Sequence, residues 1–471
     1  MYKRVLYSFT VTCCFVTMAN AQHDLGVATS GYSAINSLYL NPANISGCNE
    51  KLVVSLFSLN TFVDNNLGTF SKISELGNNN PFNVSGNAPF SMLAPVIDLH
   101  LPAILISLND KLKQSFALTT RVRAMNQFNH FDPTLYQTAT SSDHTASQDY
   151  TYQSANFNWT AHVWSEVGLS YALQLMDNGP HNIKAGVTLK YLGGIDYLAV
   201  KGKNLDVKYT AGNDTFYAKN SDLEFASNAI SSNSAVSNGV QSSDVLGSLF
   251  GSKAGSGFGM DIGVTYTYNI GGDNKSGDND NTGNDGHKLK VSAAVTDIGA
   301  IKYKEGNNYF INVTGNGYLT GSGLSQHTGN FSDFSSYAKS QGFTADTGSK
   351  ATKVYMPTAL ITGIDYQASR LIYVNATYIA NLANRQNFGN SYYSQVSLTP
   401  RLDYKLITVG LPITYSALAS DVKVGLGFRV SGFFFGSDDM LALLSSNQHG
   451  FGVYFGGYIP LYKKKHKDSF K

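Results

Sequence analysis

Apolar residues recur at every second position along many segments of this chain. In residues 258–268 the apolar positions are Phe258, Met260, Ile262, Val264, Tyr266 and Tyr268, and their neighbours are glycine, aspartate and threonine. The same period of two appears in 167–173, 183–191, 289–295, 395–404, 407–415 and 422–430. Because successive side chains of a β-strand point to opposite faces, each segment has one apolar and one polar face. The pattern predicts an all-β protein.

The length of these segments separates two kinds of β-protein. They run to about ten residues, which is the length a tilted strand needs to cross a bilayer. Their polar face carries glycine, threonine and isolated charges, which suit a lumen, and no second class of element is expected after residue 51. We therefore predict a transmembrane antiparallel β-barrel of about 14 strands over residues 51–461, with an even strand count. A soluble β-sandwich would also alternate and is the structural alternative.

Connections between the segments predict an orientation. Tight turns are expected near 368–369, 404–405 and 431–432, and longer loops near 126–160, 221–257, 300–356, 382–391, 417–420 and 439–449. Outer-membrane barrels have short periplasmic turns and long outer loops. The last strand, 450–459, should then end in the periplasm. The Asn/Asp/Gly-rich segment 271–286 breaks this rule, and its role stays open.

The N-terminus has the layout of a secretory signal peptide. Lys3 and Arg4 precede an apolar stretch over residues 5–18, and Ala19-Asn20-Ala21 follows as a cleavage site. The apolar stretch is too short for a transmembrane helix, which needs about 20 residues. We expect residues 1–21 to be removed and the mature chain to reside in the outer membrane.

The composition argues against nucleic-acid binding and against disulfide stabilisation. The 34 Lys and Arg residues nearly balance the 32 Asp and Glu residues, so no basic surface for nucleic acid is expected. Beyond the signal peptide, Cys48 is the only cysteine, which excludes an internal disulfide. Glycine and tyrosine are abundant, at 45 and 29 residues, as suits strands that end at a membrane–water boundary.

Catalytic and metal-binding motifs were sought along the whole chain. The histidines form no close metal-ligand pair, and neither a nucleophile elbow nor a P-loop occurs. Residues 255–259 resemble a nucleotide loop but open a strand, so no helix N-terminus would meet a phosphate. The stretch 278–283 resembles a calcium loop, but Leu289 stands where a bidentate glutamate is needed. We expect no enzyme activity, no cofactor and no metal.

Charges on the polar strand faces are the best candidates for a functional site. Inside a barrel such charges should pair or face water, because an unpaired buried charge is costly. They form either a structural ion-pair network or a polar path through the lumen. The candidates are Arg121, Arg123, Glu166, Lys190, Asp261, Arg401, Asp403, Lys423 and Arg429.

Residues 22–50 precede the first strand and carry a short motif. A small-residue stretch, 31–40, leads into Asn41, Pro42 and Ala43. This resembles the N-terminal segment of FadL-type outer-membrane transporters and of the related PorV-type barrels. The resemblance implies a hatch folded inside the barrel. From the residues alone, Pro42 restricts Asn41 to extended conformations, which also fits an ordinary surface turn before a strand.

The whole mature chain also resembles an uncharacterised Bacteroidetes family of outer-membrane barrels. The resemblance rests on residues 41–44, 164–171, 295–299, 397–404 and 424–438. It implies an architecture and no chemistry.

These resemblances leave two functions open. The FadL-type resemblance implies passive transport of small hydrophobic molecules across the outer membrane. The PorV-type resemblance implies a non-transporting barrel that scaffolds or shuttles secreted or surface proteins. The partners are then outer-membrane lipid, a small hydrophobic ligand, or a secreted or periplasmic protein. The basic tail 462–471 could contact periplasmic partners, although such tails are commonly just solvated.

The mature N-terminus is directly testable. We predict that the protein purified from cells starts at Gln22 and fractionates with outer membranes, because the cleavage site is followed by strands. N-terminal sequencing and membrane fractionation check this. A chain starting at Met1, or one recovered from the soluble periplasm, would contradict it.

Overall fold

The computed structural model describes eleven stretches of the chain: residues 24–48, 50–70, 82–84, 89–108, 111–133, 148–228, 254–269, 287–306, 308–327, 331–441 and 448–462. The predicted signal peptide, the segment 271–286 and the basic tail after Tyr462 lie outside them. Among the described residues, no helix combines the length and the hydrophobicity needed to cross a bilayer.

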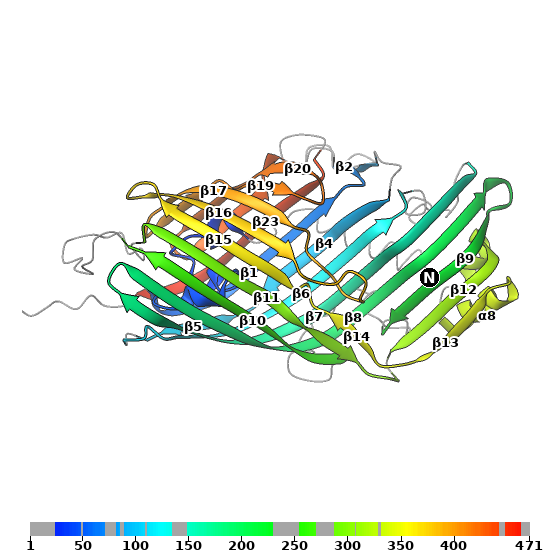
Figure 1. The fold of residues 1–471 in the computed structure, drawn as a ribbon, viewed down its shortest axis with the longest axis horizontal. Coiled ribbons are helices and arrows are strands. Elements are labelled where there is room, and N and C mark those ends of the chain that lie inside the picture. The colour runs from blue at the N-terminus through cyan, green and yellow to red at the C-terminus, as the bar shows by residue number, and fades with distance from the viewer. Residues whose placement is uncertain are drawn as a thin grey trace, which may run out of the picture.

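The described strands form a closed antiparallel barrel of 14 strands (Figure 1). Some of these strands are interrupted and carry two labels. In order around the wall they are β1 (Glu50–Asn65), β4 (Phe90–His100) with β5 (Ala103–Ser107), β6 (Ser115–Phe131), β7 (Tyr150–Asn178), β8 (His181–Thr210), β10 (Gly255–Tyr268), β11 (Leu289–Tyr303), β14 (Thr352–Tyr355) with β15 (Ala359–Gln367), β16 (Ile372–Asn381), β17 (Gln395–Asp403), β18 (Ile407–Gly410) with β19 (Ile413–Ser416), β20 (Asp421–Val424) with β21 (Leu426–Val430), β22 (Phe433–Asp439) and β23 (Gly450–Tyr462). β23 pairs with β1 and closes the barrel. The predicted fold class is confirmed.

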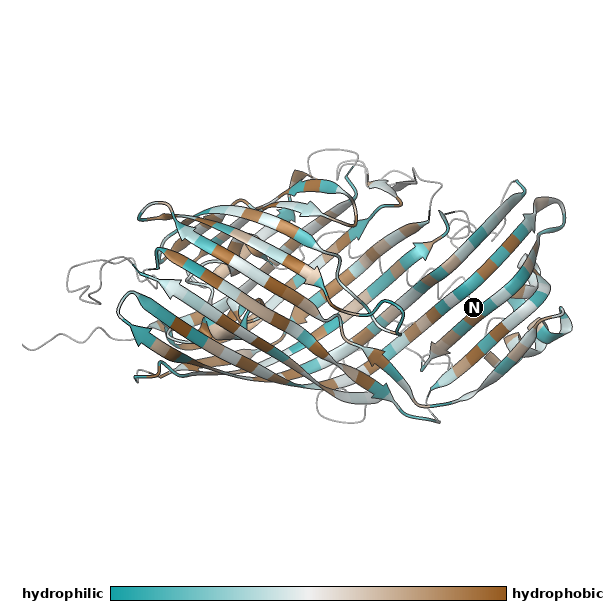
Figure 2. Ribbon diagram, viewed as in Figure 1, coloured by the Kyte–Doolittle hydropathy of each residue, from teal (hydrophilic) through white to brown (hydrophobic). Residues whose placement is uncertain are grey.

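Apolar and polar residues alternate along the strands (Figure 2), and the exposed side chains are mostly apolar whereas many of the buried ones are polar. On β10, Phe258 and Ile262 are exposed at 77% and 46%, whereas the alternate residues Asp261 and Thr265 are buried inside. At about 3.3 Å per residue and a tilt of about 45°, the stretch from Phe258 to Tyr268 spans about 23 Å, close to the apolar band of such barrels. We refer to this outward apolar belt as the apolar band.

The wall strand formed by β20 and β21 has the predicted facing. Val422 and Val430 are exposed, whereas Arg429 is fully buried. Lys423 turns inward and forms an ion pair with Asp64 at 2.9 Å. A shift of one residue would invert every one of these side chains, so the alternation allows a single register.

The tight turns lie at one end of the barrel. Hydrogen bonds close two of them at Ala368–Ile372 and Tyr404–Ile407, and Val430 pairs with Phe433 across the third, as predicted. The first and last strands also start and end there, because Glu50 pairs with Tyr462. We call this end the turn end, and the other the loop end.

A large extension rises from the loop end. It is built on β7 and β8, which are 29 and 30 residues long. β8 pairs with β10 over residues 181–194 and with β9 (Thr215–Ser227) over residues 198–210. β9 then pairs with β12 (Tyr309–Thr320), and β12 with β13 (Thr344–Ser349). Two helices, α7 (Gly321–His327) and α8 (Phe331–Ser340), complete the extension at the right of Figure 1.

The helix α8 covers the outward face of the extension. Lys201 on β8 points into the barrel, where its ammonium lies 5.0 Å from the ring centre of Phe388. The neighbouring Val200 therefore points outward. Val200 belongs to a buried apolar cluster that includes Phe216, Ile311 and Ala338 of α8. In the extension the outward side chains are thus buried against α8, whereas in the apolar band they are exposed.

Three loop predictions were wrong for the residues that the structure describes. Residues 126–131 belong to β6, residues 150–160 to β7 and residues 221–227 to β9, and residues 300–356 contain β12, β13, β14 and both helices. The predicted loop parts 134–147 and 229–253 lie outside the described residues. The expectation that no second class of element follows residue 51 is wrong because α7 and α8 do. One face of the extension meets solvent, so its strands are rich in polar residues and resemble loops in composition.

Smaller elements complete the described fold. β2 (Gly68–Phe70) pairs with β3 (Phe82–Val84) in a separate two-stranded sheet. A short 3-10 turn, η3 (Ala211–Asn213), joins β8 to β9 in a hairpin. The predicted longer loop at 417–420 is a short turn between β19 and β20.

Two equally exposed positions test where the apolar band lies. Ile262 in the band is 46% exposed, and Tyr318 on the extension is 43% exposed. We predict that Ile262→Arg lowers the free energy of unfolding in lipid vesicles by about 2–4 kcal/mol, because the guanidinium would face lipid. Tyr318→Arg should cost less than about 0.5 kcal/mol. Urea titrations of both variants check this, and equal losses would argue against membrane embedding.

Candidate functional site

The N-terminal segment, residues 24–48, lies inside the barrel at the turn end (Figure 1). It consists of α2 (Leu25–Ala28), α3 (Ala34–Ser37) and the 3-10 helix η1 (Pro42–Ile45). Its short helices contact strands on opposite sides of the barrel: α2 packs on β18 and β21, and η1 packs on β7, β8 and β10.

The Asn-Pro-Ala motif attaches this segment to the wall. The Asn41 side chain accepts a hydrogen bond from Ala43 N at 2.8 Å and donates to the carbonyl of Val264 at 3.0 Å. Pro42 occupies the first turn of η1, where its missing N–H costs nothing. The wall makes room with glycine: a Cβ at Gly186 would lie 2.4 Å from the Pro42 carbonyl carbon. Asn41, Pro42 and Ala43 are all buried.

A second attachment involves two of the predicted lumen charges. Asp403 accepts hydrogen bonds from Ser30 Oγ at 2.6 Å and from Gly31 N at 3.2 Å. The guanidinium of Arg429 lies 5.1 Å from the ring centre of Tyr32. The segment is therefore held on both sides of the barrel.

Seven charged side chains meet in the middle of the lumen. We call them the central cluster: Asp98, Arg121, Arg123, Glu166, Lys190, Asp261 and Asp297. Lys190 Nζ lies 2.7 Å from carboxylate oxygens of both Asp261 and Asp297, and Arg123 lies 2.8 Å from Asp297. Arg121 reaches Glu166 at 3.1 Å. Their side chains are 1–8% exposed, apart from Asp98 at 19%, so each charge depends on its partners.

A second cluster lies nearer the turn end. Arg401 binds Asp365 through two hydrogen bonds of 2.6 and 2.7 Å, and its Nε lies 3.3 Å from Asp403. His287 Nε2 lies 2.8 Å from Asp365. Arg429 donates to Thr408 Oγ1 at 2.7 Å. This cluster supports the Asp403 carboxylate that holds the N-terminal segment.

The predicted charges therefore separate into three groups. Arg121, Arg123, Glu166, Lys190 and Asp261 come together in the central cluster. Arg401, Asp403 and Arg429 form the second cluster, and Lys423 pairs separately with Asp64. Sequence reasoning missed several partners, namely Asp64, Asp98, His287, Asp297 and Asp365.

Asp297 shows why a partner was missed. Its φ is 57°, and the pairing of β10 with β11 shifts between Met260 and Ile262 at this point. The bulge turns Asp297 inward, out of step with a simple alternation. The aspartate inside an otherwise apolar and small-residue stretch, 295–299, was the available signal.

The loop between β16 and β17, residues 382–394, enters the lumen from the loop end. We call it the inner loop. Ser391 N donates to Gln127 Oε1 at 2.7 Å, and Asn390 Nδ2 donates to the carbonyl of Thr160 at 3.0 Å. The Tyr392 hydroxyl accepts a hydrogen bond from Arg123, and the Tyr393 hydroxyl donates to Asn129. The sequence predicted a longer connection here but not its inward course.

Burial affects two groups that lie between the wall strands. It raises the pKa of Tyr392 to about 12, so this side chain stays a neutral hydroxyl beside Arg123. It also raises the pKa of Asp24, helped by the nearby carboxylates of Asp438 and Asp98. Asp24 of the N-terminal segment is thus a carboxylate that is hard to ionise.

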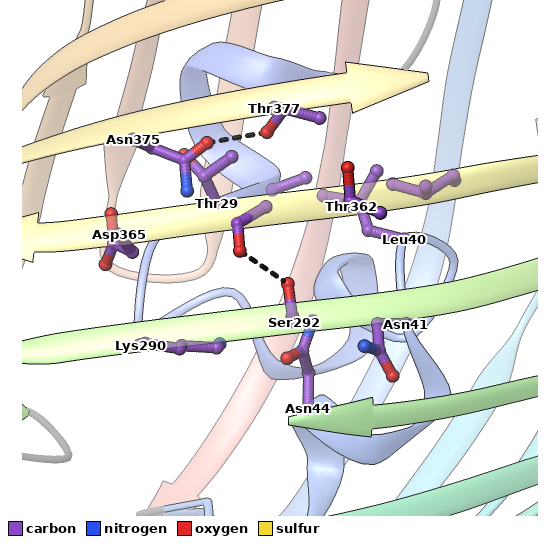
Figure 3. Close-up of a pocket in the computed structure, with 13 residues that line it drawn as sticks. Thr29, Leu40, Asn41, Asn44, Lys290, Ser292, Thr362, Asp365, Asn375 and Thr377 are labelled. Atoms are coloured by element: carbon purple, nitrogen blue, oxygen red, sulfur yellow. Dashed lines mark hydrogen bonds between the residues drawn. The ribbon is translucent and has the colours of Figure 1, made fainter. Parts of the chain in front are cut away.

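Two small cavities lie between these elements. One, of about 40 Å³, is lined by Asn41, Asn44, Lys290, Asp365 and Asn375 among others (Figure 3). The other, also of about 40 Å³, lies at the central cluster beside Asp24, Asn36, Tyr39 and Tyr392. Such volumes hold a few waters, whereas small-molecule sites usually measure about 300 Å³ or more. The N-terminal segment and the inner loop leave only water-sized gaps at these two places.

Metal chemistry has no visible site in the described part of the chain. No group of three or more His, Cys, Asp or Glu side chains there is arranged to hold a metal ion.

The sequence profile of a family of unknown function (DUF5723) matches residues 33–438. The chain belongs to this family. No curated protein matches this DUF5723 member.

Solved structures resemble the DUF5723 barrel at a low level. The toluene transporter TodX of P. putida is 11% identical with a TM-score of 0.44, over 91% of this chain and 94% of that one. A Pseudomonas aeruginosa FadL homologue is 11% identical with a TM-score of 0.40, over 94% and 98%. The monoaromatic hydrocarbon channel CymD is 11% identical with a TM-score of 0.39, over 93% and 94%.

The central cluster yields a test with a matched control. Lys190→Met would leave Asp261 and Asp297 without their shared cation, and we predict a loss of about 3–5 kcal/mol in the free energy of unfolding. Lys203→Met removes the same charge from a side chain that is 70% exposed and pairs with Asp222 at 3.2 Å, and should cost about 0–1 kcal/mol. Denaturant titrations check both. Similar small losses would mean that the central cluster is solvated.

Proposed function

We propose that this protein is an outer-membrane barrel through which small molecules pass passively. The closed wall with an apolar outside and a polar inside supports a membrane location, because a closed sheet satisfies every backbone group in lipid. The FadL-type resemblance of the N-terminal motif suggests hydrophobic solutes. The N-terminal segment acts as the predicted hatch in this proposal.

One observation carries the proposal: the lumen is occupied by two separate chain segments that are attached without covalent cross-links. The N-terminal segment enters from the turn end, and the inner loop enters from the loop end. Both are held by hydrogen bonds and charge contacts, which exchange readily for bonds to water. A barrel of this width cannot be filled by side chains of its own wall, so the two segments close a lumen that would otherwise be open.

Transport can be measured in reconstituted vesicles. We predict that proteoliposomes containing the folded barrel take up small labelled solutes faster than vesicles with heat-denatured protein. The rate should rise in proportion to the amount of barrel and need no ion gradient. Solutes of graded polarity, from an aromatic hydrocarbon to a sugar, define the range. If correctly folded barrel passes none of them, the transport proposal fails.

A second function is favoured by the extension. Its strands β9, β12 and β13 and its helices α7 and α8 form a folded surface beyond the apolar band. A loop that only connects two strands would not need these elements. Such a surface suits the PorV-type alternative, in which the barrel scaffolds or shuttles a secreted or surface protein. Capture of one defined secreted protein by the extension, together with no solute uptake, would favour this alternative.

A further inference from the structure

The inner loop inserts three aromatic rings into the lumen, and each ring lies beside a cation. Phe388 lies 5.0 Å from Lys201 Nζ, and the Tyr392 ring lies 5.9 Å from the Arg123 guanidinium. Tyr393 lies 4.2 Å from the guanidinium of Arg385 in the same loop. Attraction between a cation and a ring face is strongest where water is excluded. Two of these rings, Phe388 and Tyr392, thus meet cations of the wall.

The wall offers a prepared surface to Tyr392. Arg123 is 1% exposed and has the ring of Trp164 on its other side, at 4.9 Å. It also donates to the Tyr392 hydroxyl, while Asn129 accepts from the Tyr393 hydroxyl. Arg123 and Asn129 lie on β6, and Trp164 lies on β7, so continuous strand ladders hold all three. These residues would remain in place if the loop moved away.

The part of the inner loop around Tyr392 is held differently from the N-terminal segment. The backbone of the N-terminal segment packs directly on wall glycines; at Gly410 a Cβ would lie 2.2 Å from the Gly26 carbonyl oxygen. The inner loop has such backbone packing at Gly389, next to Tyr355. By contrast, the contacts of residues 390–393 with β6 pass through side chains, such as Gln127 to Ser391 and Arg123 to Tyr392. A solute that offers equivalent bonds can replace such contacts one for one.

We propose that Arg123 and Trp164 form a binding site for a small aromatic molecule that carries a hydroxyl group, and that Tyr392 occupies this site in the closed state. A solute arriving from the loop end competes with Tyr392 and displaces the inner loop. The inference rests on the proposed function, since it names the solute class and the site within the same lumen.

The hydroxyl group distinguishes the proposed ligands from other small aromatic molecules. Arg123 is buried, so a ligand without an acceptor would leave its N–H group unsatisfied, which is costly. A site built to bind a hydroxyl group therefore discriminates strongly against the analogue that lacks it. The inference predicts that a phenol binds and that the matching hydrocarbon does not.

The chain contains two tryptophans, Trp159 and Trp164, which gives a direct probe. In the full-length chain with Trp159→Phe, Trp164 reports alone. We expect p-cresol to change its fluorescence saturably and toluene to do so at least tenfold more weakly. Tyr392→Ala removes the competitor and should tighten p-cresol binding about tenfold. The control Tyr415→Ala removes an outward tyrosine that is 48% exposed and should leave binding unchanged.

Folding is checked for each variant by its heat-dependent shift in electrophoresis, and Tyr392→Phe serves if Tyr392→Ala does not fold. Tyr392→Phe keeps the ring but loses the hydroxyl, so it should tighten p-cresol binding by a smaller factor. Equal binding of toluene and p-cresol, or no tightening in the folded Tyr392 variant, overturns the inference. Solute uptake by proteoliposomes is measured separately. If uptake occurs but the binding experiments fail, the inference is overturned and the proposed function stands. If no solute is taken up, the proposed function is overturned.

Discussion

Closure of the sheet by the pairing of β1 with β23 is the constraint on which the rest of the structure depends. Edge strands in lipid would leave backbone N–H and C=O groups without partners. The closing register runs from Glu50 opposite Tyr462 to Asp64 opposite Gly450. Once the wall is closed, alternate side chains must either face outward to the apolar band or crowd into one enclosed space. The charges of the central cluster meet because closure brings β4, β6, β7, β8, β10 and β11 around the same space.

Charge pairing in the lumen then determines what else can fit there. Buried cations such as Arg123 and Lys190 need carboxylates, and Asp297 serves both. Two chain segments fill much of the remaining space. The N-terminal segment supplies Tyr39, which lies against Arg121 at 5.3 Å, and the inner loop supplies Tyr392 against Arg123. The two segments thus meet the same cluster from opposite ends of the barrel.

The regular part of the wall could be predicted from the sequence because its signal is local. Alternation over residues 258–268 or 422–430 predicts both the strand and which of its side chains face outward. The tight turns near 369, 405 and 431 were predicted because they lie between such strands. The extension could not be predicted, since β9, β12 and β13 are polar on one face and β9 pairs with β12, from which β10 and β11 separate it in sequence. The same holds for Asp297, whose inward direction depends on a bulge, and for the inner loop, whose course depends on side chains of β6 and β7. The motif at Asn41 indicated a hatch, but the contacts that hold this segment in the lumen involve strands distant in sequence.

The N-terminal segment also bears on the order of assembly. It runs directly into β1, and β1 is the strand that meets β23 from the other end of the chain. Strand pairs so distant in sequence form late, because the whole intervening chain must first be arranged. Ser30 and Asn41 bind Asp403 and Val264, which belong to strands that must already be in place. Docking of the segment and sealing of the wall are therefore coupled steps at the end of folding, and a chain lacking residues 24–48 would seal around an unfilled and highly charged interior.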